Sequence, residues 1–313
     1  MTVELTSLQP LWPSSYGRQA DGLTESIMAE GLRRPLWIWT DGVNRFLLAG
    51  RRRLEVLLSL GRSAVPALIL PENFPHDKAL ALGLADNRER GWNQAEAALM
   101  WRFLVEDLGE KGAVALAGHL DLAQSPKLRQ WSFDAAGLPE KGLIALAEGR
   151  LDLEIGARLA RWTPENQGAA LDLFDRLNPS KQKKKQWLDW LEDVSRRENT
   201  TPATILTADE IRAALAEAER IGRPAAEEAA RKYLWSRRHP LLAELAATRQ
   251  ARLRGLNLPR SARLELDPTF EDLKFSLELT FSTPADFDRL AEAVAGLRHS
   301  PDFQQLLDDD HER

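Results

Sequence analysis

The hydrophobic period of the chain changes twice, and this constrains the fold more than any other feature. Short apolar runs lie near the N-terminus, at residues 36–39, 46–48 and 65–70. From Trp92 to about residue 250 the apolar residues recur at helical spacing, and beyond that the sequence alternates again. Because strands repeat every two residues and helices about every 3.6, the pattern predicts strands in two regions and helices between them.

Residues 1–92 are predicted to form an α/β domain. Two of the apolar runs flank Asp41-Gly42-Val43-Asn44, which has the backbone freedom that a hairpin turn needs. Helices are expected over residues 51–60 and 76–90. Because proline has no N–H to donate, Pro66 indicates that its strand lies at a sheet edge or begins there.

Residues 93–205 are predicted to form an all-α domain, followed by a helical linker over residues 206–254. Two residue pairs have the spacing of a capping box, in which side chains satisfy the backbone N–H groups at a helix start. These pairs are Asn93 with Glu96 and Thr207 with Glu210.

Residues 255–313 are predicted to form a small ββα unit. Alternation in Arg263–Leu266 and in Lys274–Phe281 indicates two half-buried strands. Thr283 and Pro284 have the features of an N-cap and a first helical residue. Such a unit is too small for a core of its own, so we expect it to pack against a second copy.

The composition excludes several function classes. The 313 residues contain no cysteine, which excludes disulfides, thiolate nucleophiles and cysteine-based zinc sites. The five histidines lie far apart in the sequence, so a structural metal is not expected. The net charge of −5 argues against a protein that coats nucleic acid, although a local basic patch could still bind phosphates. Without a signal peptide or a membrane-spanning stretch in the sequence, we expect a cytoplasmic protein with no membrane partner.

The segment from Phe46 to Val56 indicates an anion-binding turn. A strand would deliver Gly50, and a helix would open with Arg51, Arg52 and Arg53. A helix start offers unpaired N–H groups and the positive end of the helix dipole, and arginine adds permanent charge. Cations disfavour the first turn of a helix, so their presence indicates a bound anion. A solvent-exposed basic helix start is the alternative.

This turn resembles the G-E-R-R-x-R-A box of the ParB-like family, the DNA-partition and nucleoid-associated proteins. Gly50, Arg52 and Arg53 match the box. Arg51 stands in place of the family's Glu, Glu55 in place of its second-turn Arg, and Val56 in place of Ala.

Two further boxes resemble the same family, in the same order and at the same spacing. Residues 26–36 resemble its "SI…GL.QP" segment, with Arg34 in place of Gln. Residues 86–90 resemble its E-N-x-Q-R box. They keep Asn87 and Arg90, have Asp86 for Glu, and replace Gln by Glu89.

The resemblance implies an α+β fold with three parts: a ParB/sulfiredoxin-like N-terminal domain, a helix-turn-helix domain and a ββα dimerisation unit. It also implies CTP and Mg²⁺ as ligands. The implied nucleotide-binding residues are Gly50, Arg51, Arg52, Arg53, Arg34, Asn87 and Arg90, and the implied metal ligands are Asp86 and Asn87.

Arg34 and Glu89 bear on nucleotide hydrolysis, because both stand where the family has Gln. Arginine can stabilise phosphate charge, but it cannot position an attacking water as glutamine does. We therefore expect nucleotide binding with slow hydrolysis or none. Catalytic residues stay unknown, and enzymatic activity stays open, with a weak CTPase as the candidate.

The family places a helix-turn-helix after these boxes. Here the first helix is expected over residues 113–119, the turn over 120–122 and the recognition helix over 123–136. The "LPE" that follows in the family matches residues 138–140. The candidate DNA contacts are Gln124, Ser125, Lys127, Arg129 and Gln130. A helical bundle without groove contacts is the alternative.

The run Lys181-Gln-Lys-Lys-Lys-Gln186 is the most basic in the chain. Ser180 is expected to cap the helix that it begins. Read as a phosphate-contacting patch, the run would use Lys183, Lys184 and Lys185. A solvated helix face is the alternative.

Three functions are compatible with these features. The first is a CTP-responsive DNA clamp in plasmid or chromosome partition or nucleoid organisation, nucleoid-associated and homodimeric through its C-terminal unit. The second is an enzyme, because the N-terminal fold resembles sulfiredoxin and some relatives are nucleases. Sulfiredoxin chemistry, however, needs the thiolate that this chain lacks. The third is a transcriptional regulator of the same fold that has lost nucleotide hydrolysis. Whether a partition ATPase is a partner stays open.

Overall fold

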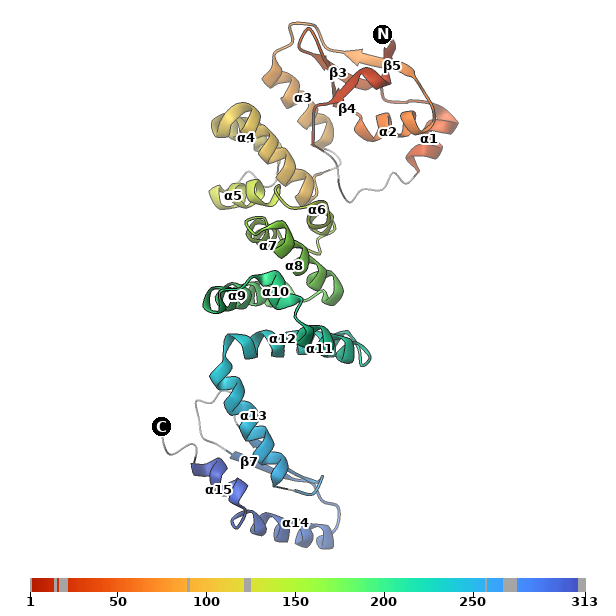
Figure 1. The fold of residues 1–313 in the computed structure, drawn as a ribbon. Coiled ribbons are helices and arrows are strands. Elements are labelled where there is room, and N and C mark those ends of the chain that lie inside the picture. The colour runs from red at the N-terminus through yellow and green to blue at the C-terminus, as the bar shows by residue number, and fades with distance from the viewer. Residues whose placement is uncertain are drawn as a thin grey trace. The chain divides into compact units, whose positions relative to one another are not determined.

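The computed structural model describes residues 2–13, 16, 22–88, 91–120, 125–256, 258–266 and 275–308. The fold is mixed α+β and mostly helical, with one sheet near each end of the chain (Figure 1). The chain divides into two compact units, residues 1–230 and 231–313. None of the described helices has the length and apolar character needed to cross a membrane.

The first unit begins with a five-stranded sheet of order β1-β5-β3-β4-β2. Its strands are β1 (Thr2–Glu4), β2 (Leu8–Pro10), β3 (Leu36–Thr40), β4 (Arg45–Ala49) and β5 (Ala64–Ile69). The helices of this part are η1 (Leu5–Ser7), α1 (Leu23–Glu30), α2 (Arg51–Ser59) and α3 (His76–Arg88). β3 and β4 form the predicted antiparallel hairpin.

The hairpin turn is held by Asp41. Its carboxylate accepts hydrogen bonds from the backbone N–H groups of Asn44 (2.7 Å) and Val43 (2.9 Å). These two bonds lower the pKa of the Asp41 carboxyl. The predicted turn is thus confirmed, and the aspartate supplies its main stabilising contacts.

β5 lies inside the sheet, between β1 and β3. Residues 64–66 pair with β1, whereas residues 67–69 pair with β3. Pro66 therefore lies in the first half of β5, where its missing N–H removes no pairing with β3. β5 is therefore neither an edge strand nor one that begins at Pro66, and the proline is accommodated because β3 pairs only from residue 67 onward.

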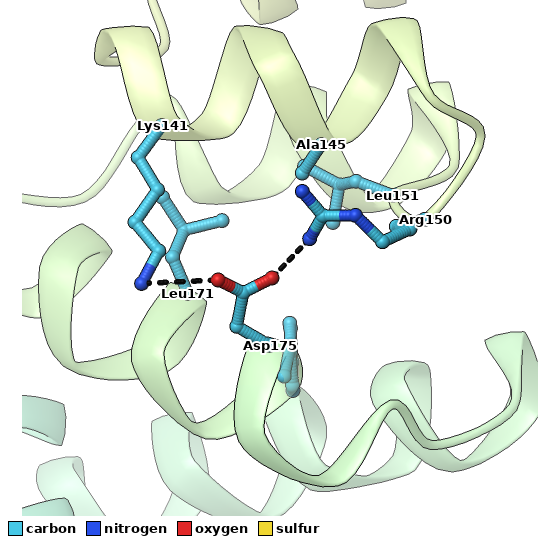
Figure 2. Close-up of a pocket in the computed structure, with 7 residues that line it drawn as sticks. Lys141, Ala145, Arg150, Leu151, Leu171 and Asp175 are labelled. Atoms are coloured by element: carbon cyan, nitrogen blue, oxygen red, sulfur yellow. Dashed lines mark hydrogen bonds and ion pairs between the residues drawn. The ribbon is translucent and has the colours of Figure 1, made fainter.

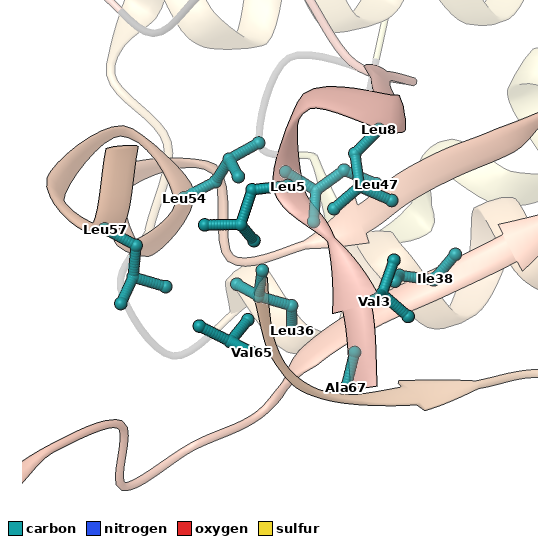
Figure 3. Close-up of a cluster of buried hydrophobic side chains, with 10 residues drawn as sticks. All are labelled: Val3, Leu5, Leu8, Leu36, Ile38, Leu47, Leu54, Leu57, Val65 and Ala67. Atoms are coloured by element: carbon teal, nitrogen blue, oxygen red, sulfur yellow. The ribbon is translucent and has the colours of Figure 1, made fainter. Parts of the chain in front are cut away.

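Both faces of the sheet are covered. On one face, side chains of the sheet and of α2 form a buried cluster (Figure 3). Its members are Val3, Leu5, Leu8, Leu36, Ile38, Leu47, Leu54, Leu57, Val65 and Ala67. A second cluster contains Trp39 and Leu48 of the sheet with Ala79 of α3. The junction of β4 with α2 is therefore anchored by two cores.

The rest of the first unit is helical. Its elements are α4 (Gln94–Leu116), η2 (Ala117–His119), α5 (Pro126–Ala135), α6 (Glu140–Ala147), α7 (Leu153–Leu159), α8 (Pro164–Leu177), α9 (Lys181–Glu198), α10 (Pro202–Leu206), α11 (Asp209–Glu219) and the start of α12 (Arg223–Arg238). Leu80 and Leu84 of α3 share a core with Met100, Trp101 and Leu104 of α4. Packing is therefore continuous across residue 92.

The two capping predictions have different outcomes. Asn93 and Glu96 form the complete capping box at the start of α4. Thr207 does not cap α11, because its hydroxyl donates a hydrogen bond to the carbonyl oxygen of Ala203 (2.8 Å). The residue before α11 is Ala208, which offers no side-chain cap.

The second unit contains α13 (Pro240–Gly255), β6 (Ala262–Leu266), β7 (Phe275–Leu279), α14 (Pro284–Leu297) and α15 (Pro301–Asp308). The strand–strand–helix order and the Thr283 cap of α14 match the prediction. The expectation that this unit lacks a core of its own is wrong. Leu256, Leu297 and Leu306 form a small core, to which α15 contributes.

Candidate functional site

Gly50 connects β4 to α2 in a conformation that favours glycine. Its φ is 104°, and the first turn of α2 has no side-chain cap. A Cβ at this position would lie 2.7 Å from Cδ2 of Leu36 and 3.1 Å from the guanidinium carbon of Arg53. A helix start without an N-cap side chain is the arrangement expected where an anion binds the backbone N–H groups.

Arg53 joins the three sequence boxes. Its Nη1 donates hydrogen bonds to the carbonyl oxygens of Arg34 (2.7 Å) and Pro35 (2.8 Å). Its Nη2 lies 3.8 Å from Oδ2 of Asp86. Burial lowers the pKa of Arg53, and the Asp86 carboxylate opposes that effect. In this arrangement Arg53 braces the loop before β3 and the end of α3 against the start of α2.

Arg51 pairs with Glu55, and both residues depart from the family pattern. Its Nε donates a hydrogen bond to Oε1 of Glu55 (3.0 Å), and its Nη1 donates one to the carbonyl oxygen of Trp12 (3.1 Å). The two departures thus form one ion pair along α2. Arg52 is half-buried in the first turn of α2, and Arg34 is exposed.

Of the two expected metal ligands, Asp86 is the one whose side chain the structure describes. The side chain of Asn87 and the whole of Arg90 lie outside the described residues. Among the residues that the structure describes, no three His, Asp or Glu side chains group together as a metal site. Magnesium commonly takes one or two carboxylates and completes its shell with waters and phosphate oxygens. The Asp86 carboxylate therefore fits Mg²⁺ as one ligand in a shell that phosphate completes.

The expected DNA-reading helices correspond in position to the second half of α4 and to α5. Gly109, with φ 70° and ψ 168°, divides α4 into two helices, so the first helix begins before the expected residue 113. Ser125 caps α5 by accepting a hydrogen bond from the N–H of Leu128 (3.2 Å), and Pro126 is the first helical residue. α5 therefore starts at Pro126 and not at residue 123. Gln124 and the expected turn lie largely outside the described residues.

The side chains of α5 differ in their exposure. Lys127 and Gln130 are exposed. The ammonium of Lys127 lies 4.6 Å from the ring centroid of Trp131, and Gln130 donates a hydrogen bond to Asp134 (2.9 Å). Arg129 turns inward, with its Nε buried and its guanidinium carbon 6.0 Å from the ring centroid of Trp101. Of these three residues, Lys127 and Gln130 are the exposed ones.

The basic run at the start of α9 makes contacts between helices. Ser180 caps α9 as predicted. Lys183 pairs with Glu227 of α12, and Lys185 pairs with Glu154 of α7. Lys184 is buried, its ammonium donates a hydrogen bond to the carbonyl oxygen of Arg150, and burial lowers its pKa. The expectation that Lys184 contacts phosphate is therefore corrected: it is an interior residue.

A separate pocket lies between α6 and α8 (Figure 2). Asp175 stands between Lys141 and Arg150 and forms an ion pair with each of them. Lys141 also bonds Asp172, and this hydrogen bond raises the pKa of Lys141. Neighbouring carboxylates therefore neutralise both cations of this pocket.

Sequence reasoning missed Trp12. Its Nε1 donates a hydrogen bond to the carbonyl oxygen of Leu48 (2.5 Å), and its own carbonyl accepts the bond from Arg51. The Trp12 ring lies against Gly83 of α3, where any Cβ would clash with it. A glycine inside the alanine- and leucine-rich α3 was the available signal, because such a glycine often marks close packing.

The relatives of the chain bear on these expectations. No protein-family model matches the sequence. The chromosome-partitioning protein ParB of Myxococcus xanthus (strain DK1622) is 27% identical over 159 residues, which cover 49% of this chain and 51% of that protein. About half of this chain is thus similar to a ParB protein. It spans about half the length of the curated relative that it matches.

Two solved structures are also similar, both of a C-terminally truncated chromosome-partitioning protein ParB from Caulobacter crescentus. The one complexed to the centromeric parS site is 18% identical with a TM-score of 0.32, covering 59% of this chain and 97% of that chain. The one complexed with CTP-gamma-S is 20% identical with a TM-score of 0.26, and the match covers 56% of this chain and 98% of that chain. The similarity to ParB proteins rests on the three boxes and the curated relative, not on these superpositions.

Proposed function

We propose that this protein is a DNA-binding protein whose N-terminal pocket binds CTP with magnesium, and that it acts in plasmid or chromosome partition or nucleoid organisation. The observation that carries the proposal is that residues of all three sequence boxes lie at the guanidinium of Arg53. Arg53 contacts the backbone at Arg34 and Pro35 and lies beside Asp86. These are the segments that the ParB-like resemblance assigns to a single nucleotide site.

In this proposal the nucleotide phosphates lie at the start of α2. The N–H groups after Gly50 and the charges of Arg52 and Arg34 bind them. Asp86 and Asn87 hold Mg²⁺, which neutralises phosphate charge when it is bound. Arg53 is a positioning residue that keeps the walls of the pocket together. Because Arg34 stands in place of a glutamine, hydrolysis is slow or absent.

The proposed DNA surface is the start of α5 with its neighbours. Lys127 and Gln130 are exposed there, and Lys185 lies at the start of α9. Lysine neutralises phosphate charge, and glutamine can read adenine in the major groove.

The proposed dimer contact lies in the second unit. Leu277, Phe281 and Phe287 are 37%, 51% and 45% exposed, and the rings of Phe281 and Phe287 lie 5.1 Å apart. Exposed apolar side chains grouped in this way are typical of a surface that a second copy covers.

Fluorescence anisotropy with a labelled duplex tests the proposed function. We expect the protein to bind DNA, and CTP with magnesium to change the affinity, whereas ATP and GTP do not. Lys127→Gln should weaken binding and reduce the slope of log K against log salt by about 0.9, the value for one phosphate contact. Lys78→Gln makes the same charge change at an exposed position on α3 and serves as the control.

Two results would contradict the proposal. One is the absence of duplex binding at low salt, and the other is an affinity that does not respond to CTP. The expectation of slow hydrolysis is tested separately, by phosphate release with CTP and DNA. Release at the rate of an ordinary ParB protein would overturn it.

A further inference from the structure

The starts of α5, α7 and α9 meet around Glu154. This residue lies in the first turn of α7. Its carboxylate is 3.1 Å from the ammonium of Lys185 and 3.9 Å from that of Lys181, both in the first two turns of α9. Lys127, the second residue of α5, is near enough for its charge to act on Glu154. We call these four residues the Glu154 cluster.

Glu154 is the only acidic member of this cluster and is held in its charged form. The hydrogen bond from Lys185 lowers the pKa of the Glu154 carboxyl, and the charges of Lys181 and Lys127 lower it further. Asp152 also pairs with Lys181, at 3.5 Å, whereas Lys185 pairs with Glu154 at 3.1 Å. Three lysines at the starts of α5 and α9 would otherwise make a surface with a strong attraction for the phosphate backbone.

We infer that Glu154 competes with DNA phosphates for Lys185 and Lys181 and so limits sequence-independent binding. The inference rests on the proposed DNA-binding function. A phosphate reaches these lysines only where Glu154 releases them, and it then lies beside a like charge. Phosphate contacts supply affinity without sequence information, so restraining them leaves the base contacts of α5 to decide where the protein binds. Glu154 is therefore a specificity-determining residue.

A merely structural role would have a different signature. Glu154 also ties α7 to α9 and is favourable at a helix start, where negative charge meets the positive end of the dipole. Glu192 provides the matched control, because it too links these helices, accepting hydrogen bonds from Arg158 of α7 (2.8 and 2.7 Å). Arg158 lies in the last turn of α7, at the other end from Glu154.

The test compares Glu154→Gln with Glu192→Gln on a random-sequence duplex, by anisotropy over a salt series. For Glu154→Gln we expect about tenfold tighter binding near 0.1 M salt and a salt slope steeper by about one to two, because one or two more phosphates are neutralised. For Glu192→Gln we expect affinity and slope to stay at the wild-type values while the thermal midpoint falls. A further change, Lys185→Gln, should abolish most of the gain in the Glu154→Gln background.

The outcomes separate this inference from the proposed function. If the wild type binds the duplex and Glu154→Gln binds equally well or more weakly, the inference is overturned and DNA binding stands. If neither binds at low salt, the proposed DNA-binding function fails, and the inference fails with it. Should Glu154→Gln lose its fold by circular dichroism, Glu154→Ser provides the same removal of charge for the salt series.

Discussion

Replacing Gly50 with alanine should destabilise the N-terminal part of the protein by a predictable amount. The φ of 104° places Gly50 in the left-handed region, which costs a residue with a Cβ roughly 1–2 kcal/mol. The new Cβ would lie 2.7 Å from Leu36, whose side chain is fully buried and cannot move outward. Overpacking a buried site adds about 1–3 kcal/mol. Together these effects predict a loss of roughly 2–5 kcal/mol in the free energy of unfolding.

Urea unfolding followed by tryptophan fluorescence measures this loss, since Trp37 and Trp39 lie in the same strand as Leu36. Gly42→Ala is the control. Gly42 has φ 95°, but no atom lies within 4 Å of the new Cβ, so only the backbone cost of about 1–2 kcal/mol applies. If Gly50→Ala loses no more stability than Gly42→Ala, the close approach of Leu36 to the turn is refuted.

Three further predictions concern other parts of the molecule. Arg53→Lys should lower the free energy of unfolding by roughly 1–3 kcal/mol, because lysine cannot bond two carbonyls and reach Asp86 together; urea midpoints equal to the wild type would contradict this. Burial depresses the pKa of Lys184 below its ordinary 10.5. In the pH window between the depressed pKa and 10.5, the unfolded chain therefore binds more protons than the folded chain. The stability of the wild type relative to Lys184→Met should therefore rise with pH through the window, and a flat difference between the two unfolding curves would exclude it. Phe287→Asp should convert the proposed dimer to a monomer in sedimentation at micromolar concentration, and a wild type that is already monomeric would rule out the dimer.

Local patterns predicted β3, β4, β5, α2 and α3 of the N-terminal domain, but not β1, β2 and α1 or the order of the strands. The hairpin of β3 and β4 follows from two short apolar runs and the chemistry of Asp41, all within a few residues. The position of β5 depends instead on its pairing with β1, in which Pro66 pairs with Thr2, a residue far from it in the sequence. No local signal in the sequence specifies such a distant pairing.

The three boxes were expected to lie together, and they meet at Arg53. The contacts of Arg53 were not predictable, because whether it reaches phosphate or backbone carbonyls depends on the path of the loop at Arg34 and Pro35. The ion pair of Arg51 with Glu55 could have been predicted, because four-residue spacing places the two on one helix face.

The burial of Lys184 also had a sequence signal. Lys184 stands three to four residues before Trp187 and Leu188, which are buried on the same face of α9. Helical spacing thus places this lysine on the apolar stripe, and the charge of the surrounding run concealed that pattern.

Calorimetric titration with CTP, ATP and GTP, each with magnesium, tests the proposed pocket most directly. We expect CTP to bind the wild type at one site per chain, and ATP and GTP to give no binding heat. Arg52→Ala should weaken CTP binding by at least about tenfold, because a hydrogen bond to a charged group is worth roughly 1.5–3 kcal/mol. Equal binding of all three nucleotides, no binding of any, or an Arg52→Ala variant that binds CTP as the wild type does would contradict a CTP site at the Gly50 turn.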